Sequence, residues 1–98
     1  MELKLDLKMA TPTQALDGMR RPFMHAFGRG WVGRRLANAA WPAFHAALLH
    51  GSGIAVAASH AQTAADECNL RTMLVARWPR RRIAHTVRCA VHSAADAG

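Results

Sequence analysis

The sequence predicts a mostly α-helical fold: a small helical domain of three to four short helices with one N-terminal β-strand. Three observations lead to this fold class. The chain has 98 residues, the size of a single small domain (1–98). Residues 2–9 alternate strictly between charged and apolar side chains, as a strand does. Farther along, apolar residues recur at helical spacing between glycines and prolines that end helices.

The predicted strand lies within residues 1–10. Its period of two places leucines and a methionine on one face and charged side chains on the other. A single strand leaves backbone hydrogen-bonding groups unpaired along both edges. Because no similar segment follows, we expect a second copy of the chain to supply the partner, which gives a homodimer through residues 2–9. Fraying or a short helix is the alternative for this segment.

Two helices are predicted in the first half of the chain. Thr11-Pro12-Thr13 favours the start of a short helix that runs through Met19 or beyond, although Gly18 and Pro22 both interrupt it. A flexible Gly-rich connection is predicted over residues 28–33. The second helix should begin at Trp31 or Arg34 and run to Pro42, which should break or kink it.

Pro42 can also open a third helix, which the second Gly-rich connection at residues 51–53 should end. The residues of this helix that share one face are Phe44, Ala47 and Leu48.

The strongest helical pattern in the second half covers Thr63 to Trp78. Thr63 and Asp66 resemble a capping box, and acidic residues suit the positive end of a helix. Its apolar stripe contains Leu70, Met73, Leu74 and Trp78. A last helix is predicted over Arg82–Ala94. Its apolar face contains Ile83, Val87, Ala90, Val91 and Ala94.

The distribution of charge is the most informative feature for function. The net charge is +7, and no carboxylate occurs between Asp17 and Asp66 or from Cys68 to Ala95. Arginines do occur in both of these runs. Charges without neighbouring acids repel one another or bind an anion from outside. We therefore expect the partner to be nucleic acid or another anionic surface, such as an acidic protein or lipid.

The segment Arg77 to Arg82 combines a basic cluster with an aromatic residue. Arginines neutralise phosphates, and a tryptophan can stack on an unpaired base. The leading interpretation is a small basic accessory protein that binds nucleic acid non-specifically through arginine clusters. The predicted contact residues are Arg34, Arg35, Arg77, Trp78, Arg80, Arg81 and Arg82. The alternative for this segment is a solvated loop whose tryptophan covers the preceding helix.

Two further interpretations stay open for the whole chain. The first is a protein-interaction or dimerisation module that uses the N-terminal strand. The second is a GC-rich open reading frame with no selected function, as a high-GC bacterial genome would produce. Residues with GC-rich codons (Ala, Arg, Gly, Pro) make up 43 of the 98 positions, so codon composition also explains the preference for arginine over lysine.

The order of a strand followed by helices resembles, from Glu2 to about Leu49, the ribbon-helix-helix DNA-binding family. The resemblance implies a dimer that pairs one strand from each subunit and turns the charged strand residues toward DNA. Carboxylates at Glu2 and Asp6 depart from that role. Element order alone assigns no family.

No metal site, cofactor site or catalytic site is predicted. His85, Cys89 and His92 share one face of the last helix, but a zinc site usually has four ligands, and nothing places Cys68 nearby. We expect both cysteines to be reduced. Because no set of nucleophile, base and orienting group is visible, the chain is not predicted to be an enzyme.

We expect a cytoplasmic protein with no integral membrane span. The most apolar window, residues 43–61, contains three histidines and two glycines. Export or organellar targeting stays open, because Arg20-Arg21-Pro22-Phe23-Met24 resembles a twin-arginine motif and Ser59-His60-Ala61 resembles a cleavage site.

Overall fold

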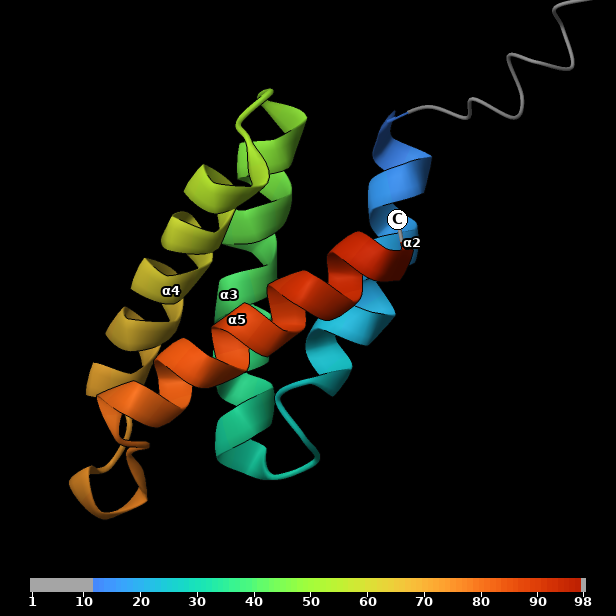
Figure 1. The fold of residues 1–98 in the computed structure, drawn as a ribbon. Helices are drawn as coiled ribbons and strands as arrows, with labels where there is room; N and C mark the ends of the chain where they lie inside the picture. The colour runs from blue at the N-terminus through green and yellow to red at the C-terminus, as the bar shows by residue number, and fades with distance from the viewer. Residues whose placement is uncertain (1–11, 98) are drawn as a thin grey trace, which may run out of the picture.

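The computed structural model describes residues 12–97. In chain order its elements are α2 (Pro12–His25), α3 (Trp31–Leu49), α4 (Ile54–Leu70), the short 3-10 helix η1 (Leu74–Ala76) and α5 (Arg80–Ala97). The mostly helical fold class is confirmed, with four α-helices and no strand in this part of the chain (Figure 1). The strand and the dimer contact predicted for residues 2–9 lie outside the described residues.

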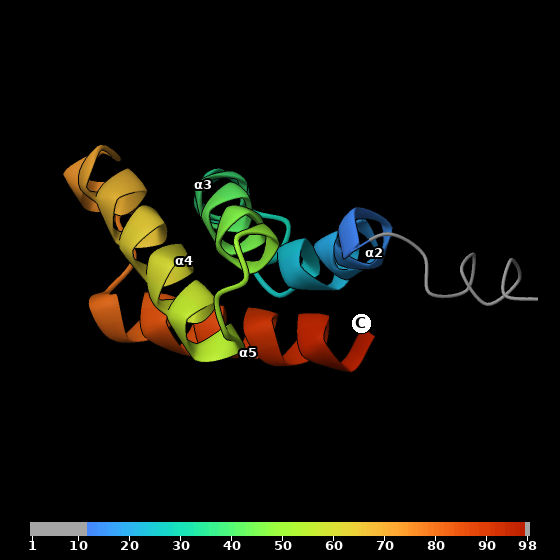
Figure 2. The same cartoon turned by 90° about the horizontal axis from the view of Figure 1, so that it is seen from above.

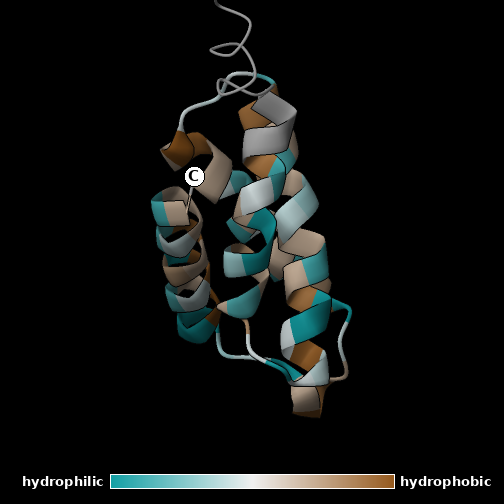
Figure 3. Ribbon diagram, turned by 90° about the vertical axis from the view of Figure 1, so that its right-hand side faces the viewer, coloured by the Kyte–Doolittle hydropathy of each residue, from teal (hydrophilic) through white to brown (hydrophobic). Residues whose placement is uncertain are grey.

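The helices form two layers. Viewed from above, α2, α3 and α4 lie side by side, with α3 in the middle, and α5 runs across all three (Figure 2). Hydrophobic and hydrophilic residues alternate along each helix, as expected for helices that bury one face (Figure 3). The apolar faces meet in one core cluster.

The aromatic part of this core surrounds Phe23 of α2, which is completely buried. Its ring centroid lies 5.0 Å from that of Phe44, 5.4 Å from that of Trp41 and 5.7 Å from that of Phe27. These spacings are typical of packed aromatic pairs. The cluster therefore joins α2 to α3 and holds the loop that connects them.

Helix α2 runs to His25, so the helix predicted through Met19 or beyond is confirmed, and Gly18 and Pro22, which the sequence predicts to interrupt it, lie within it. A proline in a helix interior costs about 3 kcal/mol. Complete burial of one methionine or phenylalanine side chain stabilises a fold by about 1.5–3 kcal/mol. Because Met19 and Phe23 are both buried on the face that α2 turns toward the core, packing outweighs the local cost.

Helix α3 likewise continues through Pro42, so the predicted break into two helices is wrong. Proline lacks the N–H that would bond to the carbonyl of Asn38. Asn38 and Pro42 are both exposed, which lets water hydrate that carbonyl, while Trp41 and Phe44 fix the helix by burial. Gly33, predicted to be part of the flexible connection over residues 28–33, is a buried residue of α3.

Helix α4 begins at Ile54 and ends at Leu70, so the helix predicted over Thr63 to Trp78 is misplaced. Thr63 and Asp66 lie inside the helix, and Asp66 accepts hydrogen bonds of 3.3 and 3.4 Å from the side chain of Gln62 rather than capping the start. The buried face is made of alanines four residues apart, which allows close approach to α3. These alanines are Ala57, Ala61 and Ala65.

Side-chain caps explain why α4 ends at Leu70. Thr72 Oγ1 donates to the Cys68 carbonyl oxygen at 3.1 Å. Arg77 donates from Nη2 to the Leu70 carbonyl oxygen at 2.6 Å and from Nε to the Thr72 carbonyl oxygen at 3.0 Å. The bond to Leu70 satisfies a carbonyl group that a helix end leaves unpaired, and the other two hold the turn that follows α4. Leu70, Met73 and Leu74, the predicted apolar stripe, are consequently exposed.

The prediction for the last helix is confirmed, with ends slightly beyond Arg82 and Ala94. The five predicted apolar residues, Ile83, Val87, Ala90, Val91 and Ala94, are all buried. The predicted connection at residues 51–53 also separates two helices, and Gly51 adopts a φ of +87°, a conformation that favours glycine.

Candidate anion-binding surface

Most arginines lie at one end of the helical layers. The path of the chain brings together the end of α2, the start of α3, the end of α4 and the start of α5, which form the lower end of the molecule in Figure 1. Arginines from two distant parts of the sequence therefore share this end. We call it the basic end; its arginines are Arg29, Arg34, Arg35, Arg71, Arg77, Arg80, Arg81 and Arg82.

Carboxylates do not neutralise these side chains. Among the described residues, the two ion pairs join a histidine to an aspartate: His45 to Asp17 at 3.8 Å and His92 to Asp96 at 3.5 Å. No arginine forms an ion pair with a carboxylate of residues 12–97. In the part of the chain that the structure describes, Asp66 and Glu67 are the two carboxylates near the basic end, against eight arginines. Positive charge is therefore in excess at the basic end itself, as it is in the chain as a whole.

Trp78 is anchored in the fold through its backbone and its ring. Its backbone N–H donates to Asn69 Oδ1 at 3.0 Å, and its carbonyl oxygen accepts from Asn69 Nδ2 at 2.9 Å. The ring is partly buried against the core. The guanidinium carbon of Arg82 lies 3.7 Å from the ring centroid, in cation–π geometry. One face of the indole is therefore already covered.

Gly33 explains how the start of α3 comes so close to Trp78. A Cβ at Gly33 would lie 3.3 Å from Trp78 Cζ2 and would also collide with the Phe27 carbonyl oxygen. Only glycine leaves room for this packing. The contact brings Arg34 and Arg35, which follow Gly33 directly, into the same region as the start of α5.

The seven predicted contact residues divide into two groups. Arg77, Trp78 and Arg82 interact within the protein, through the cap of α4 and the cation–π contact. The other four are exposed, and their side chains form no hydrogen bond or ion pair within the described part of the chain. These four are Arg34, Arg35, Arg80 and Arg81.

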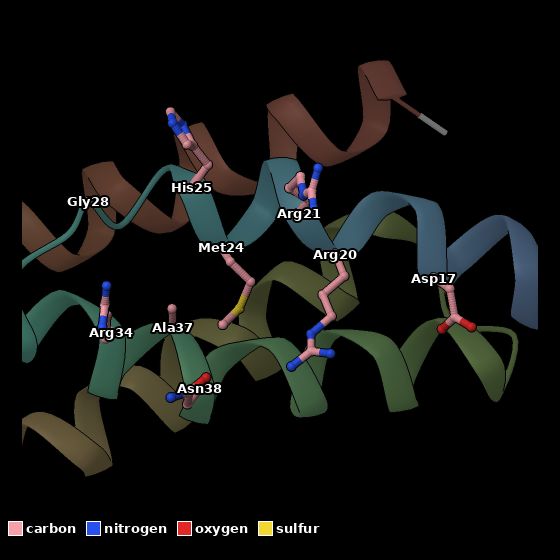
Figure 4. Close-up of a pocket in the computed structure, with 9 residues that line it drawn as sticks. All are labelled: Asp17, Arg20, Arg21, Met24, His25, Gly28, Arg34, Ala37 and Asn38. Carbon is pink, nitrogen blue, oxygen red and sulfur yellow. The ribbon is translucent and has the colours of Figure 1, made fainter.

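A groove between α2 and α3 extends this surface. It has a volume of about 550 Å³, and its lining includes Arg20, Arg21, His25 and Arg34. In Figure 4, Arg20 points from α2 toward α3, Arg34 points from α3 toward α2, and Met24 lies between them. Asp17 is the one acidic residue among the described residues that line it. Sequence reasoning did not place Arg20, Arg21 and His25 in a site, although the acid-free run contains all three.

The histidines and cysteines do not form a metal site. His85 Nε2 lies 3.5 Å from Cys89 Sγ on the exposed face of α5, as their spacing predicts. Across residues 12–97, no three histidine, cysteine or acidic side chains are grouped to hold a metal ion. Cys68 and Cys89 are both free thiols; Cys68 Sγ lies 3.6 Å from the Arg35 carbonyl oxygen.

The segments that resemble export signals are parts of helices. Arg20 to Met24 lie in α2, where Phe23 is buried, and Ser59 to Ala61 lie in α4, where Ala61 is buried. None of the helices described here has the length and apolar character needed to cross a membrane.

Comparisons of this chain with protein families, with curated proteins and with solved structures find no match.

Proposed function

We propose that this protein is a small basic accessory protein that binds nucleic acid without sequence preference, through contacts to backbone phosphates. The observation that supports the proposal is the convergence of eight arginines at one end of the fold, where none is paired with a carboxylate of the described residues. Arginine matches phosphate geometry and keeps its charge at every physiological pH. Phosphate contacts fix orientation but read no sequence directly.

The environment of Trp78 favours phosphates over bases as the point of contact. A base stacks on an aromatic ring only if a face of that ring is accessible. Arg82 covers one face of Trp78, and the ring is packed against the core and close to Gly33. Contact is therefore assigned to the four predicted contact arginines that are exposed and have no partner among the described residues, Arg34, Arg35, Arg80 and Arg81, with Arg77, Trp78 and Arg82 forming their support.

The groove between α2 and α3 lengthens the proposed contact surface. Arg34 belongs both to the basic end and to the lining of the groove, so a nucleic-acid backbone lying along one reaches the other. Arg20, which points across the groove toward α3, would then meet a further phosphate. The acidic Asp17 limits this surface along α2.

A salt titration of binding to duplex DNA and to single-stranded RNA tests the proposal. If these four arginines and Arg20 each neutralise one phosphate, log Kobs should fall against log salt on duplex DNA with a slope of roughly −4 to −5, at about −0.9 per contact. Duplexes of unrelated sequence should bind equally well. Binding that does not depend on salt, or that strongly prefers one sequence, would contradict phosphate contact as the basis of affinity.

A further inference from the structure

The connection between α4 and α5 exposes four large apolar side chains within six residues. Leu70 is 65% exposed, Met73 67%, Leu74 75% and Val75 89%. We call these four residues the apolar tip. Figure 1 shows this connection, in orange, projecting beyond the ends of α4 and α5. Grouped exposure of aliphatic side chains at a projecting turn marks an interaction site more often than scattered exposure does.

Arginines surround the apolar tip. Arg71 lies within the same segment, and Arg80 lines a small surface pocket together with Leu70 and Asp66. Arg80 and Arg81 are exposed at the start of α5, four residues or more beyond the tip. The occupant of this surface must therefore accept both aliphatic side chains and positive charge.

The combination of exposed aliphatic side chains and arginines discriminates among three candidate occupants of this surface. A second copy of the chain would bring two sets of arginines together, and their repulsion opposes pairing through the tips. A nucleic-acid backbone accepts the arginines but buries aliphatic side chains only if a base step is opened. The interface of an anionic bilayer accepts both, with the apolar side chains among the acyl chains and the arginines at the headgroups.

We infer that the apolar tip inserts into the interface of an anionic phospholipid bilayer while the arginines beside it contact the headgroup phosphates. The attachment is peripheral, because none of the helices within residues 12–97 can cross a membrane. Leu74 and Val75, in η1, form the inserted apex, and Arg71, Arg80 and Arg81 form the headgroup contacts. This inference does not depend on nucleic-acid binding.

The test is co-sedimentation of the full chain with vesicles of phosphatidylcholine alone or of phosphatidylcholine mixed with phosphatidylglycerol, at matched ionic strength. The double variant Leu74→Gln/Val75→Gln keeps every charge and changes only exposed side chains. Loss of their apolar contact should weaken binding to the mixed vesicles by roughly tenfold or more. Val56→Gln, which changes an exposed valine of α4 away from the tip, should bind like the unchanged chain.

Four outcomes overturn the inference. The first is absence of binding to the mixed vesicles, and the second is equal binding to both vesicle types. A third is equal binding by the double variant and the unchanged chain, which would mean that charge alone attracts the protein. The fourth is a loss of DNA binding or of self-association in the double variant with vesicle binding unchanged, which would assign the tip to nucleic acid or to a second copy. Circular dichroism of each variant verifies that the helices persist.

Discussion

The arginines of the basic segment Arg77 to Arg82 have two different roles. Arg77 caps α4 through carbonyl oxygens, and Arg82 covers the indole ring. Arg80 and Arg81 extend into solvent. The sequence identifies all of them as candidate contacts, because it reports charge and residue type. It does not report which guanidinium groups already have partners. The partners of Arg77 are the backbone carbonyl oxygens of Leu70, at the end of α4, and of Thr72, just beyond that end.

Substitution of Trp78 should mainly reduce stability. Trp78→Ala removes a partly buried ring that packs beside Gly33 and against the guanidinium group of Arg82, so the free energy of unfolding should fall by on the order of 2–4 kcal/mol. Urea denaturation measures this change. Trp31→Ala is the matched control, because Trp31 is 57% exposed and its loss should cost much less. DNA affinity per folded molecule should not change with Trp78→Ala; a large loss of affinity in a stably folded variant would show that the ring contacts nucleic acid directly.

At the scale of whole elements, the helix that the sequence predicts well is the one with a complete apolar face. Every apolar residue predicted for the last helix is buried in α5. The helices it predicts poorly are those in which a local signal competes with packing. Gly18, Pro22 and Pro42 are unfavourable inside helices, yet burial of aromatic side chains in α2 and α3 outweighs them.

Helix α4 is predicted poorly for a different reason. Its buried face produces almost no apolar periodicity in the sequence. Alanines contribute little to an apolar pattern, whereas Leu70, Met73 and Leu74 dominate it and are exposed. The apolar pattern therefore places the predicted helix closer to the C-terminus of the chain than α4 lies. The close approach of α3 and α4 depends on small side chains, which is a property of a pair of helices rather than of one sequence segment.

A larger side chain at the centre of this face should destabilise the fold. Ala61→Leu places extra methyl groups where Ala61 is completely buried, and overpacking of this kind costs about 1–3 kcal/mol. Ala55→Leu makes the same chemical change at an exposed position of α4 and should have little effect on stability. Thermal denaturation followed by circular dichroism compares the two. Equal stability of both variants would mean that α3 and α4 are not closely packed.

For the molecule as a whole, topology concentrates charge that the sequence distributes over two separate runs. The contact between Gly33 and Trp78 joins the start of α3 to the start of α5, and with them Arg34 and Arg35 to Arg80 and Arg81. The first turns of α3 and α5 contain no acidic residue. Positive side chains at the positive end of a helix are unfavourable by about 0.3–1 kcal/mol each, and a bound anion removes this cost.

The sequence predicted the arginine clusters but not their convergence, because convergence depends on the packing of four helices. It also missed the groove between α2 and α3. Arg20 and Arg34 are fourteen positions apart in the sequence, and the antiparallel path of α2 and α3 places both along one groove, each pointing toward the opposite helix. The charge of the surface could thus be predicted, whereas its shape could not.

The salt dependence of duplex DNA binding by four matched variants tests the central claim most directly. Arg35→Gln on α3 and Arg81→Gln on α5 each remove one exposed charge from the basic end, and Arg88→Gln removes one exposed charge from the middle of α5. The account predicts that Arg35→Gln and Arg81→Gln each reduce the magnitude of the salt slope by about 1 and that their combination reduces it by about 2. Arg88→Gln should leave the slope unchanged. An equal reduction by all three single variants, or no reduction by any of them, would contradict a phosphate-binding surface at the basic end.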